Sequence, residues 1–362
     1  EKIKKTKGFD AFLIHGITGS GKTEVYMHLI DSFIKNEGQV LVMVPEINLT
    51  PQLEDRFQSR FHTKKIVSLH SHLSQPDRLE NWRLAKSGEA QIVIGTRLSV
   101  FTPFKNLTAI LMDEEHDMSF KQQDNLRYHA RDVGMMRAKL LNIPFIAGSA
   151  TPSMEIWHRA VNEKKLKLLS LTKRANEDAT LPRVDLIKTS QDLDEPLSTY
   201  LKDAIQHRLD HQQQALIFIN RRGFAPVLFC SSCGWQANCN RCSSKLVVHK
   251  NKQQLRCHHC DYQRTIDSSC QECGNVDLMT LGKGTQKIEE ELARLFPSAR
   301  IKRVDRDTIK NKKDLDQLYA DMHDHKLDIL VGTQMLSKGH DFPQLTLVGI
   351  LDADHALYSS DF

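Results

Sequence analysis

The sequence predicts an α/β protein of two parallel-sheet lobes, with a cysteine-rich module inserted in the second lobe. Short apolar runs rich in β-branched residues alternate with helical stretches, which is typical of strands buried on both faces of a parallel sheet. This alternation occurs twice along the 362 residues, once before about residue 170 and again after residue 214. All eight cysteines lie between Cys230 and Cys273, inside the second of these regions.

The first lobe begins with a loop typical of nucleotide-binding proteins. Residues 16–23 fit the pattern G-x-x-x-x-G-K-[ST], whose backbone N–H groups surround phosphate oxygens. An apolar run over 11–14 precedes the loop and a stretch with helical spacing over 23–35 follows it. This order argues against the alternative, a glycine-rich turn that matches by chance. We expect a nucleoside triphosphate to be bound by Gly16, Thr18, Gly19, Ser20, Gly21, Lys22 and Thr23.

An acidic tetrapeptide, Asp-Glu-Glu-His over 113–116, directly follows the apolar run over 109–112. The carboxyl ends of strands are where open α/β sheets bind ligands. Phosphoryl transfer depends on a metal ion and a positioned nucleophile. We therefore expect Asp113 to hold Mg²⁺, Glu114 to deprotonate the attacking water, and His116 to hydrogen-bond toward the γ-phosphate or the other lobe. In the same reaction, Lys22 would contact the β- and γ-phosphates and Thr23 would bind Mg²⁺. The alternative is an ordinary exposed acidic strand end.

The cysteines form four Cys-x-x-Cys pairs. Because we expect no secretion signal, these pairs indicate two tetrahedral zinc sites rather than disulfides. Three ways of combining the pairs are possible. The runs over 245–249 and 253–256 predict a hairpin that would bring the second pair against the third. The predicted ligands are Cys230, Cys233, Cys270 and Cys273 for one zinc ion, and Cys239, Cys242, Cys257 and Cys260 for the other.

Two alternatives to these zinc sites are open. His249, His258 or His259 could replace a thiolate, and all eight thiols could be free and reduced. The module is expected to be too small to bury a core of its own, so zinc would supply much of its folding energy.

The motifs together resemble those of superfamily 2 helicases, and the cysteine pairs narrow the resemblance to the PriA family of primosomal helicases. The residues that carry it are 16–23, 44–52, 95–97, 113–116, 148–152, 220–226 and 332–343. The resemblance covers essentially the whole chain and implies two RecA-like lobes, with the same nested combination of cysteine pairs. Gln286 departs from it, because the family usually has glutamate there.

The resemblance implies an ATP-dependent 3′-to-5′ DNA helicase that acts in replication-fork restart and primosome assembly, with ATP, Mg²⁺ and two Zn²⁺ as cofactors. It also implies partners: forked and single-stranded DNA, single-strand DNA-binding protein, PriB, DnaT, and the replicative helicase with its loader. Thr50, Arg97 and Lys338 would contact the DNA backbone. A base would stack on Phe120 or Tyr128, unless these two aromatic residues belong to the core.

The expected division of the chain is an ATP-binding lobe over 1–170, a linker over 171–196, the second lobe over 197–228 and 277–362, and the cysteine module over 229–276. The chain starts without Met and stops after Phe362, before the position of the family's arginine motif. We therefore expect a fragment that hydrolyses ATP poorly.

The charge and hydropathy of the chain are compatible with a DNA-binding protein but do not require one. The 50 basic and 45 acidic side chains leave a net charge of +5, which suits a nucleic-acid partner or a mixed-charge surface. No apolar run reaches the roughly 20 residues that span a membrane. We expect a monomer in the bacterial cytoplasm. Two rival functions are a nucleotide-gated scaffold that loads primosome proteins with little unwinding, and a translocase that never separates strands.

Overall fold

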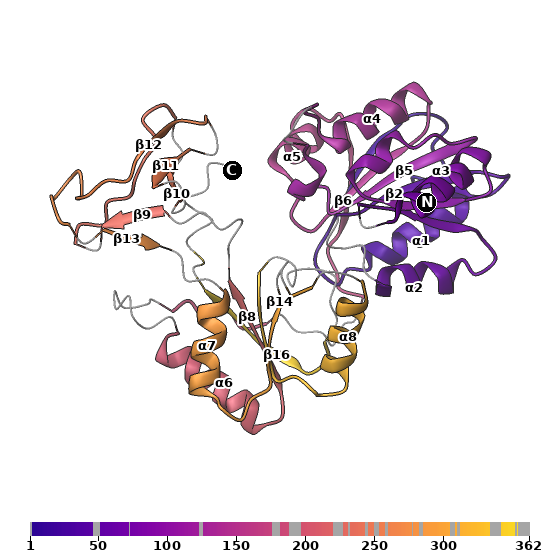
Figure 1. Cartoon of the computed structure of the whole chain (residues 1–362). Helices are drawn as coiled ribbons and strands as arrows, with labels where there is room; N and C mark the ends of the chain where they lie inside the picture. The colour runs from indigo at the N-terminus through magenta and orange to yellow at the C-terminus, as the bar shows by residue number, and fades with distance from the viewer. Residues whose placement is uncertain are drawn as a thin grey trace. The chain divides into compact units, whose positions relative to one another are not determined.

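The structure, a computed structural model, divides into two compact units, Glu1–Val184 and Asp185–Phe362 (Figure 1). The division lies inside the stretch for which the sequence predicts a linker, and each unit is described by itself. The described residues are 2–45, 51–71, 73–122, 126–175, 182–187, 197–219, 227–230, 232–242, 245–249, 253–257, 260–276, 278–281, 285–304, 308–309, 312–333, 342–351 and 353. In this part of the chain, no helix has the length and apolar character that crossing a membrane requires.

The first unit is built on a seven-stranded parallel sheet with the order β3-β4-β2-β5-β6-β1-β7. Its strands are β1 (Ala11–Gly16), β2 (Gln39–Met43), β3 (Ile66–Leu69), β4 (Ile92–Gly95), β5 (Leu107–Asp113), β6 (Phe145–Ser149) and β7 (Lys167–Leu171). The inner strands β2 and β4 are buried along their whole length, because helices cover both faces of the sheet. The carboxyl ends of the strands therefore meet at one edge, where β1 and β5 carry the predicted site residues.

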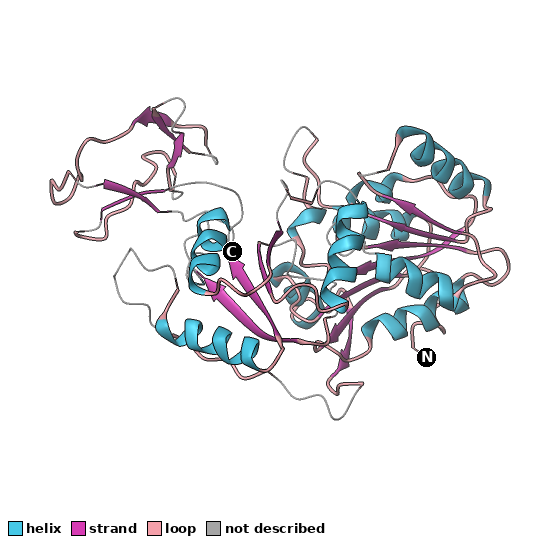
Figure 2. Cartoon of the chain, turned by 60° about the horizontal axis from the view of Figure 1, so that its bottom comes forward, coloured by secondary structure: helices cyan, strands magenta, loops and turns pink. Residues whose placement is uncertain are grey.

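Helices cover both faces of this sheet (Figure 2). They are α1 (Lys22–Phe33), α2 (Pro51–Arg60), α3 (Gln75–Ser87), α4 (Ala130–Leu140) and α5 (Met154–Val161), with the short 3₁₀ helices η2 (Arg97–Phe101) and η3 (Met118–Phe120). Ile30 of α1 and Phe57 of α2 belong to one core cluster, whereas Ala85 of α3, Ala138 of α4 and Ile156 of α5 belong to the other. Two separate cores thus hold the sheet in place.

The second unit contains a four-stranded parallel sheet with the order β14-β15-β8-β16. Its strands and helices are β8 (Gln214–Ile219), β14 (Ile301–Val304), β15 (Ile329–Gly332), β16 (Leu345–Leu351), α6 (Thr199–Asp210), α7 (Thr285–Leu295) and α8 (Lys312–His323). Strand β8 precedes the cysteines in the chain, and the other three strands of its sheet follow them. The cysteine module is therefore an insertion into this lobe, and the predicted fold class is confirmed.

The cysteine module has an antiparallel sheet with the order β12-β11-β10-β9-β13. The strands are β9 (Val227–Cys230), β10 (Val247–His249), β11 (Gln254–Arg256), β12 (Gln263–Thr265) and β13 (Leu278–Leu281). Strands β10 and β11 pair antiparallel, so the predicted hairpin is confirmed. The expectation that the module buries no core is wrong: Leu246, Val248 and Leu255 belong to a buried cluster that also contains Trp235 and four of the cysteines.

Candidate nucleotide site and metal centres

The loop between β1 and α1 has an open inner side next to two glycines. Gly19 and Gly21 have φ angles of 76° and 81°, in the left-handed region that glycine tolerates best. A Cβ atom added at Gly19 would meet nothing within 4 Å, and one added at Gly21 would come only to 3.7 Å from Ala175. A ligand can therefore approach the backbone here, with the N-terminus of α1 directed at it.

The polar side chains of this loop fit a phosphate ligand. The Lys22 ammonium donates a hydrogen bond to the Gly16 carbonyl oxygen at 2.9 Å, which keeps the side chain folded over the loop. The Ser20 hydroxyl is buried and makes no hydrogen bond to any described residue. A buried hydroxyl without a partner costs free energy unless a ligand supplies one. Thr23 lies in the first turn of α1, next to Lys22.

Asp113 ends β5 and is held by a residue of α1. The Tyr26 hydroxyl donates a hydrogen bond to the Asp113 carboxylate at 3.0 Å. Burial, and then the negative charge of Glu114, raise the pKa of Asp113 from 3.8 to about 6, although the Tyr26 hydrogen bond and the charge of Lys22 act in the opposite direction. The Tyr26 hydrogen bond joins the end of β5 to α1, whose first residue is Lys22, so the acidic box lies beside the helix that follows the phosphate loop.

His116 links the acidic box to the predicted turn over 148–152. Its Nδ1 atom lies 2.8 Å from the Ser149 hydroxyl oxygen and 3.5 Å from the Glu114 carboxylate. The same hydroxyl oxygen accepts a hydrogen bond from the Thr151 backbone at 2.9 Å. Glu114 has a φ angle of 47°, which is uncommon outside glycine. The acidic box and the turn over 148–152, which are separate in the sequence, are therefore joined by hydrogen bonds in the structure.

Glu115 has a structural role that the sequence reasoning did not identify. It is fully buried and pairs with Arg131 of α4, which is 4% exposed. An acidic box suggests exposed carboxylates, and nothing in the spacing of Glu115 and Arg131 indicates that they meet. The pair forms because α4 packs over the sheet, and the sequence does not specify that packing.

The predicted DNA-contacting residues are in different situations. Phe120 is fully buried in a core of the first unit, so it cannot serve as a stacking surface; its burial against apolar neighbours is the physical reason for this correction. Tyr128 is partly exposed and packs edge-to-face on Phe101 at 5.2 Å. The Arg97 guanidinium donates hydrogen bonds to the backbone oxygens of Ser119 and Lys121. Thr50 and Lys338 lie outside the described residues.

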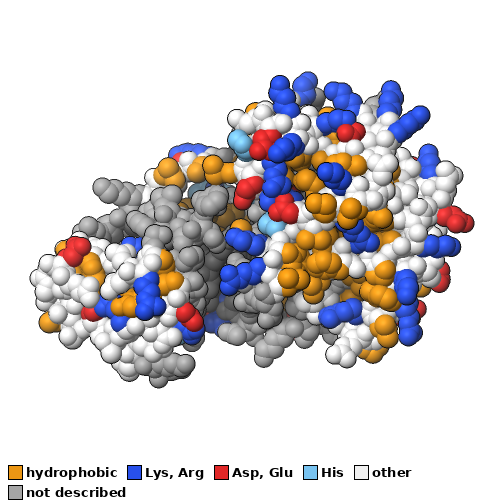
Figure 3. Space-filling model, turned by 90° about the horizontal axis from the view of Figure 1, so that it is seen from above, with side chains coloured by type: hydrophobic (Ala, Val, Ile, Leu, Met, Phe, Trp, Pro, Cys, Tyr) orange, Lys and Arg blue, Asp and Glu red, His pale blue; other side chains and the backbone are white. Residues whose placement is uncertain are grey.

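Tyr128 also lines a groove between η2 and α4, together with Phe101, Val133, Met136 and Leu140. The groove has a volume of about 610 Å³. On the side of the first unit drawn in Figure 3, lysine and arginine side chains surround apolar ones. Aromatic and basic side chains on one surface are typical of proteins that bind single-stranded nucleic acid. They are equally compatible with an apolar partner.

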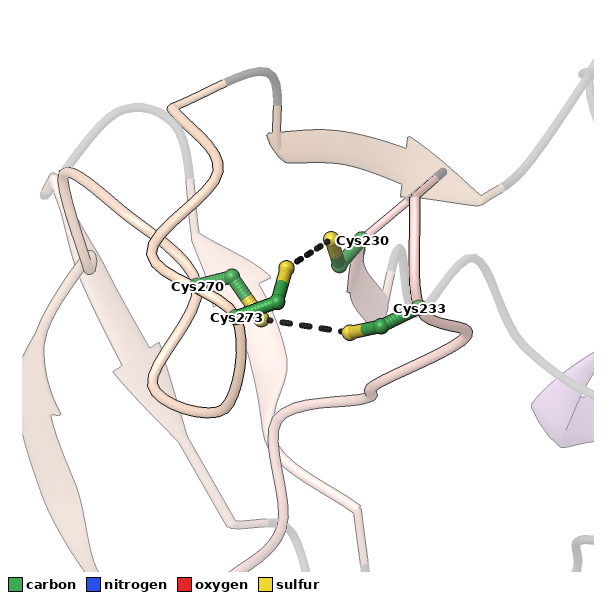
Figure 4. Close-up of side chains that lie close together, drawn as sticks. All are labelled: Cys230, Cys233, Cys270 and Cys273. Carbon is green, nitrogen blue, oxygen red and sulfur yellow. Dashed lines mark hydrogen bonds between the residues drawn. The ribbon is translucent and has the colours of Figure 1, made fainter.

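The cysteines gather in two groups of four, and these are the groups that the nested pairing predicts. In the first group, Cys230 Sγ lies 3.6 Å from Cys273 Sγ, and Cys233 Sγ lies 3.5 Å from Cys270 Sγ (Figure 4). In the second, Cys239 pairs with Cys260 at 3.4 Å, and Cys242 with Cys257 at 3.5 Å. Tetrahedral zinc with Zn–S bonds of about 2.3 Å places its sulfurs roughly 3.8 Å apart. Both groups therefore fit zinc.

The local backbone explains why the cysteines of a pair point to one place. Gly234, Asp261 and Gly274 each stand four residues after the first cysteine of a pair, and their φ angles are 78°, 65° and 73°. Each N–H donates to the carbonyl oxygen of that first cysteine, at 3.0, 3.0 and 2.9 Å. These turns bring both sulfurs to the same side. His249 belongs to neither group, and His258 and His259 lie outside the described residues.

Comparisons with known proteins agree with this arrangement. The DEAD/DEAH box helicase family matches residues 2–158, and the PriA DNA helicase Cys-rich region domain matches residues 239–264. The replication restart protein PriA of Haemophilus influenzae is 47% identical over 355 residues, which are 98% of this chain and 48% of that protein. The PriA of Bacillus subtilis is 39% identical, over 100% of this chain and 46% of its own length.

The chain thus spans about half the length of the curated relatives it matches. Among solved structures, the DUF1998 helicase MrfA bound to DNA has a TM-score of 0.55 at 15% identity, covering 94% of this chain and 42% of MrfA. That likeness shows a shared fold.

Proposed function

Because this chain belongs to the PriA family, we propose that it is the motor of an ATP-dependent DNA helicase that moves 3′ to 5′ and acts in replication-fork restart. The observation that carries the proposal is the arrangement at the carboxyl edge of the first sheet. There the glycine loop is open to a ligand, Lys22 folds over the loop, and Asp113 is hydrogen-bonded to Tyr26 of the helix that follows it. The identity to PriA proteins over nearly the whole chain supports the substrate class.

The loop residues would bind ATP through its phosphates. The backbone N–H groups around Gly19 and Gly21, and the Ser20 hydroxyl, would contact phosphate oxygens, and Lys22 would exchange its bond to Gly16 for one to the β- and γ-phosphates. Thr23 and Asp113 would hold Mg²⁺. The ion supplies Lewis-acid chemistry at the phosphoryl group when it is bound.

Glu114 would take the proton from the attacking water, since it is the carboxylate next to the proposed metal ligand. His116 would keep Glu114 oriented and, through Ser149, would link the nucleotide site to the start of α5. A loose phosphoryl-transfer transition state depends on such positioning more than on covalent chemistry.

DNA would be bound through its backbone by Thr50, Arg97 and Lys338, with one base stacked on Tyr128. The groove beside Tyr128, which is lined by apolar side chains and by Arg137, supports the stacking of a base there. The two zinc ions would hold the cysteine module in its fold. Partners proposed from the family are forked DNA, single-strand DNA-binding protein and primosome proteins.

The test is ATP hydrolysis and strand displacement by a chain extended beyond Phe362, with and without forked DNA. We expect DNA to stimulate hydrolysis, and Glu114→Gln to lower the rate by about 100-fold or more through loss of the general base. Glu80→Gln, an exposed change on α3, is the matched control and should leave the rate unchanged. Hydrolysis that is indifferent to both DNA and Glu114→Gln would refute the motor.

The scaffold alternative makes a different prediction with the same variant. A nucleotide-gated scaffold would still load primosome proteins on forks when Glu114 is replaced, whereas a motor would fail to unwind. Stimulated hydrolysis without strand displacement would instead indicate a translocase.

A further inference from the structure

A buried polar network joins the acidic box to two helices of the first unit. The Glu115 carboxylate accepts hydrogen bonds from the Ser153 backbone N–H at 2.7 Å and from the Ser153 hydroxyl at 3.0 Å. The Arg131 guanidinium donates to the Ser153 hydroxyl oxygen at 2.9 Å and lies 3.4 Å from Glu115. Three side chains thus meet: Glu115, two residues after β5, Arg131 of α4 and Ser153, the N-cap of α5. Glu115 and Arg131 are buried, and Ser153 is partly exposed.

The residues of the network lie in or next to the acidic box and the turn over 148–152. Glu115 directly follows Glu114, and its N–H donates to the carbonyl oxygen of Gly148 in β6 at 3.1 Å. Ser153 is the N-cap of α5 and ends the turn that contains Ser149, the partner of His116. Arg131 is in the first turn of α4 and also pairs with Asp132 at 3.4 Å. Every contact of Glu115 therefore limits where Glu114 and His116 can lie.

Because Glu115 is buried, breaking its hydrogen bonds costs much free energy, and the network therefore resists displacement. Each carboxylate oxygen of Glu115 has a donor, and a buried charge that loses its partner is strongly unfavourable. The left-handed φ angle of Glu114 requires an external restraint, because a non-glycine residue adopts it at a cost. The Glu115 network supplies one such restraint next to Glu114, beside the hydrogen bond from the Asp117 N–H to the Glu114 carbonyl oxygen at 2.8 Å.

We propose that Glu115, Arg131 and Ser153 are positioning residues that hold the Glu114 carboxylate and the His116 ring in the orientation needed for hydrolysis. This deepens the proposed function and rests on it. Lys22 and the glycine loop make no contact with the network, so nucleotide affinity should be independent of it. A displacement of about 1 Å at a reacting group can cost on the order of 100-fold in rate.

The main test compares two serine N-caps in the chain extended beyond Phe362. Ser153→Ala removes the hydroxyl at the centre of the network, and Ser74→Ala removes the cap of α3, whose hydroxyl oxygen accepts from Asp77 N–H at 3.3 Å. Both variants lose one helix cap. We expect Ser153→Ala to lower kcat about tenfold with KM for ATP within twofold, and Ser74→Ala to change neither.

A second set of variants separates positioning from stability. Arg131→Gln leaves the buried Glu115 carboxylate without its ion-pair partner, and Glu115→Gln leaves the buried Arg131 guanidinium with the 3.4 Å pairing to the exposed Asp132. Both single variants should lower Tm, whereas the double variant removes the buried pair of charges and should recover most of that loss. We expect kcat to stay at least tenfold low in the double variant, and Arg131→Lys to retain more activity than Arg131→Gln. If kcat recovers together with Tm, or if Ser153→Ala matches Ser74→Ala, the proposal is wrong.

One readout does not depend on hydrolysis. Amide hydrogen exchange at residues 113–116 should be faster in Ser153→Ala than in Ser74→Ala. If the unsubstituted protein hydrolyses no ATP, the proposed function fails, and this exchange measurement still decides whether the network holds the box. Equal exchange in both variants would refute the restraint itself.

Discussion

The first unit and the cysteine module define the positions of their functional side chains by different physical means. In the first unit, a seven-stranded sheet between two apolar cores places Asp113 against α1, the helix that begins at Lys22. In the module, short strands and left-handed turns bring eight sulfurs into two groups. The first arrangement should therefore respond to changes in side-chain volume, and the second to metal and to backbone conformation.

Removing zinc should produce the largest difference between the two regions. Structural zinc contributes about 10–16 kcal/mol in small domains, so a strong chelator should unfold the module. We expect proteolysis to cut within residues 230–273 after chelation, while binding of a fluorescent ATP analogue to the first unit is unchanged. A metal assay should return two zinc ions per chain before chelation. An unaltered proteolysis pattern after complete metal loss would contradict the comparison.

Gly148→Ala tests how tightly the first unit is packed around its site. A Cβ atom at this position would overlap the Tyr26 hydroxyl, which is hydrogen-bonded to Asp113. Overpacking of this kind costs about 1–3 kcal/mol, and we expect a value near 3 from denaturant unfolding. The control is Gly148→Ala with Tyr26→Phe, which removes the overlapping oxygen and should recover part of the loss. No recovery would place the strain elsewhere.

Gly234→Ala tests the corresponding dependence on backbone conformation in the module. The added Cβ atom would meet nothing within 4 Å, so the cost comes from the φ angle of 78° and should be about 1 kcal/mol. Gly234→Asn should cost less, because asparagine tolerates this conformation and Asp261 has it in an equivalent turn. Zinc affinity measured by competition with a chelator is the readout. Equal effects of both substitutions would argue against a backbone origin.

The smallest expected effect is a pH dependence confined to the first unit. Burial, and then the positive charge of Arg131, lower the pKa of His129 to about 4, and its Nδ1 atom caps α4 by accepting from the Arg131 N–H. Since the unfolded chain binds this proton at about pH 6.5, stability should fall as the pH decreases from there toward 4. Partial exposure of the ring reduces the effect to below about 1 kcal/mol.

Unfolding experiments at pH 7.5 and 5.0 would measure this loss. His129→Asn, which keeps a cap acceptor that cannot titrate in this range, should reduce the difference between the two pH values. His28→Asn, at an exposed histidine of α1, should leave it unchanged. A difference that His129→Asn does not alter would assign the pH dependence to other groups.

Much of the fold could be predicted because local patterns carried the information. The runs at β1, β2, β4, β5 and β6 are apolar throughout, since both faces of those strands are covered. The edge strands β3 and β7 were not predicted, because their alternating or exposed residues resemble surface segments. The hairpin of β10 and β11 was visible from its short connection.

The parts of the candidate site that depend on local spacing could also be predicted from the sequence. The phosphate loop and the cysteine pairs depend on residues close together in the chain, so their spacing carries the geometry. Phe120 was given a possible stacking role because an aromatic residue after the acidic box looks the same whether it is exposed or buried. Only the packing of η3 on the core decides between the two.

The sequence by itself determined the glycine loop, the acidic box, the four cysteine pairs and the alternation of strands with helices, because each depends on neighbouring residues or on a simple period. The tertiary structure alone decided that Tyr26 holds Asp113 and that His116 reaches Ser149. It also decided that Glu115 is buried against Arg131 and Ser153. These contacts join residues far apart in the chain, and they arise from the order of strands in the sheet and the helices packed over it, which no local pattern specifies.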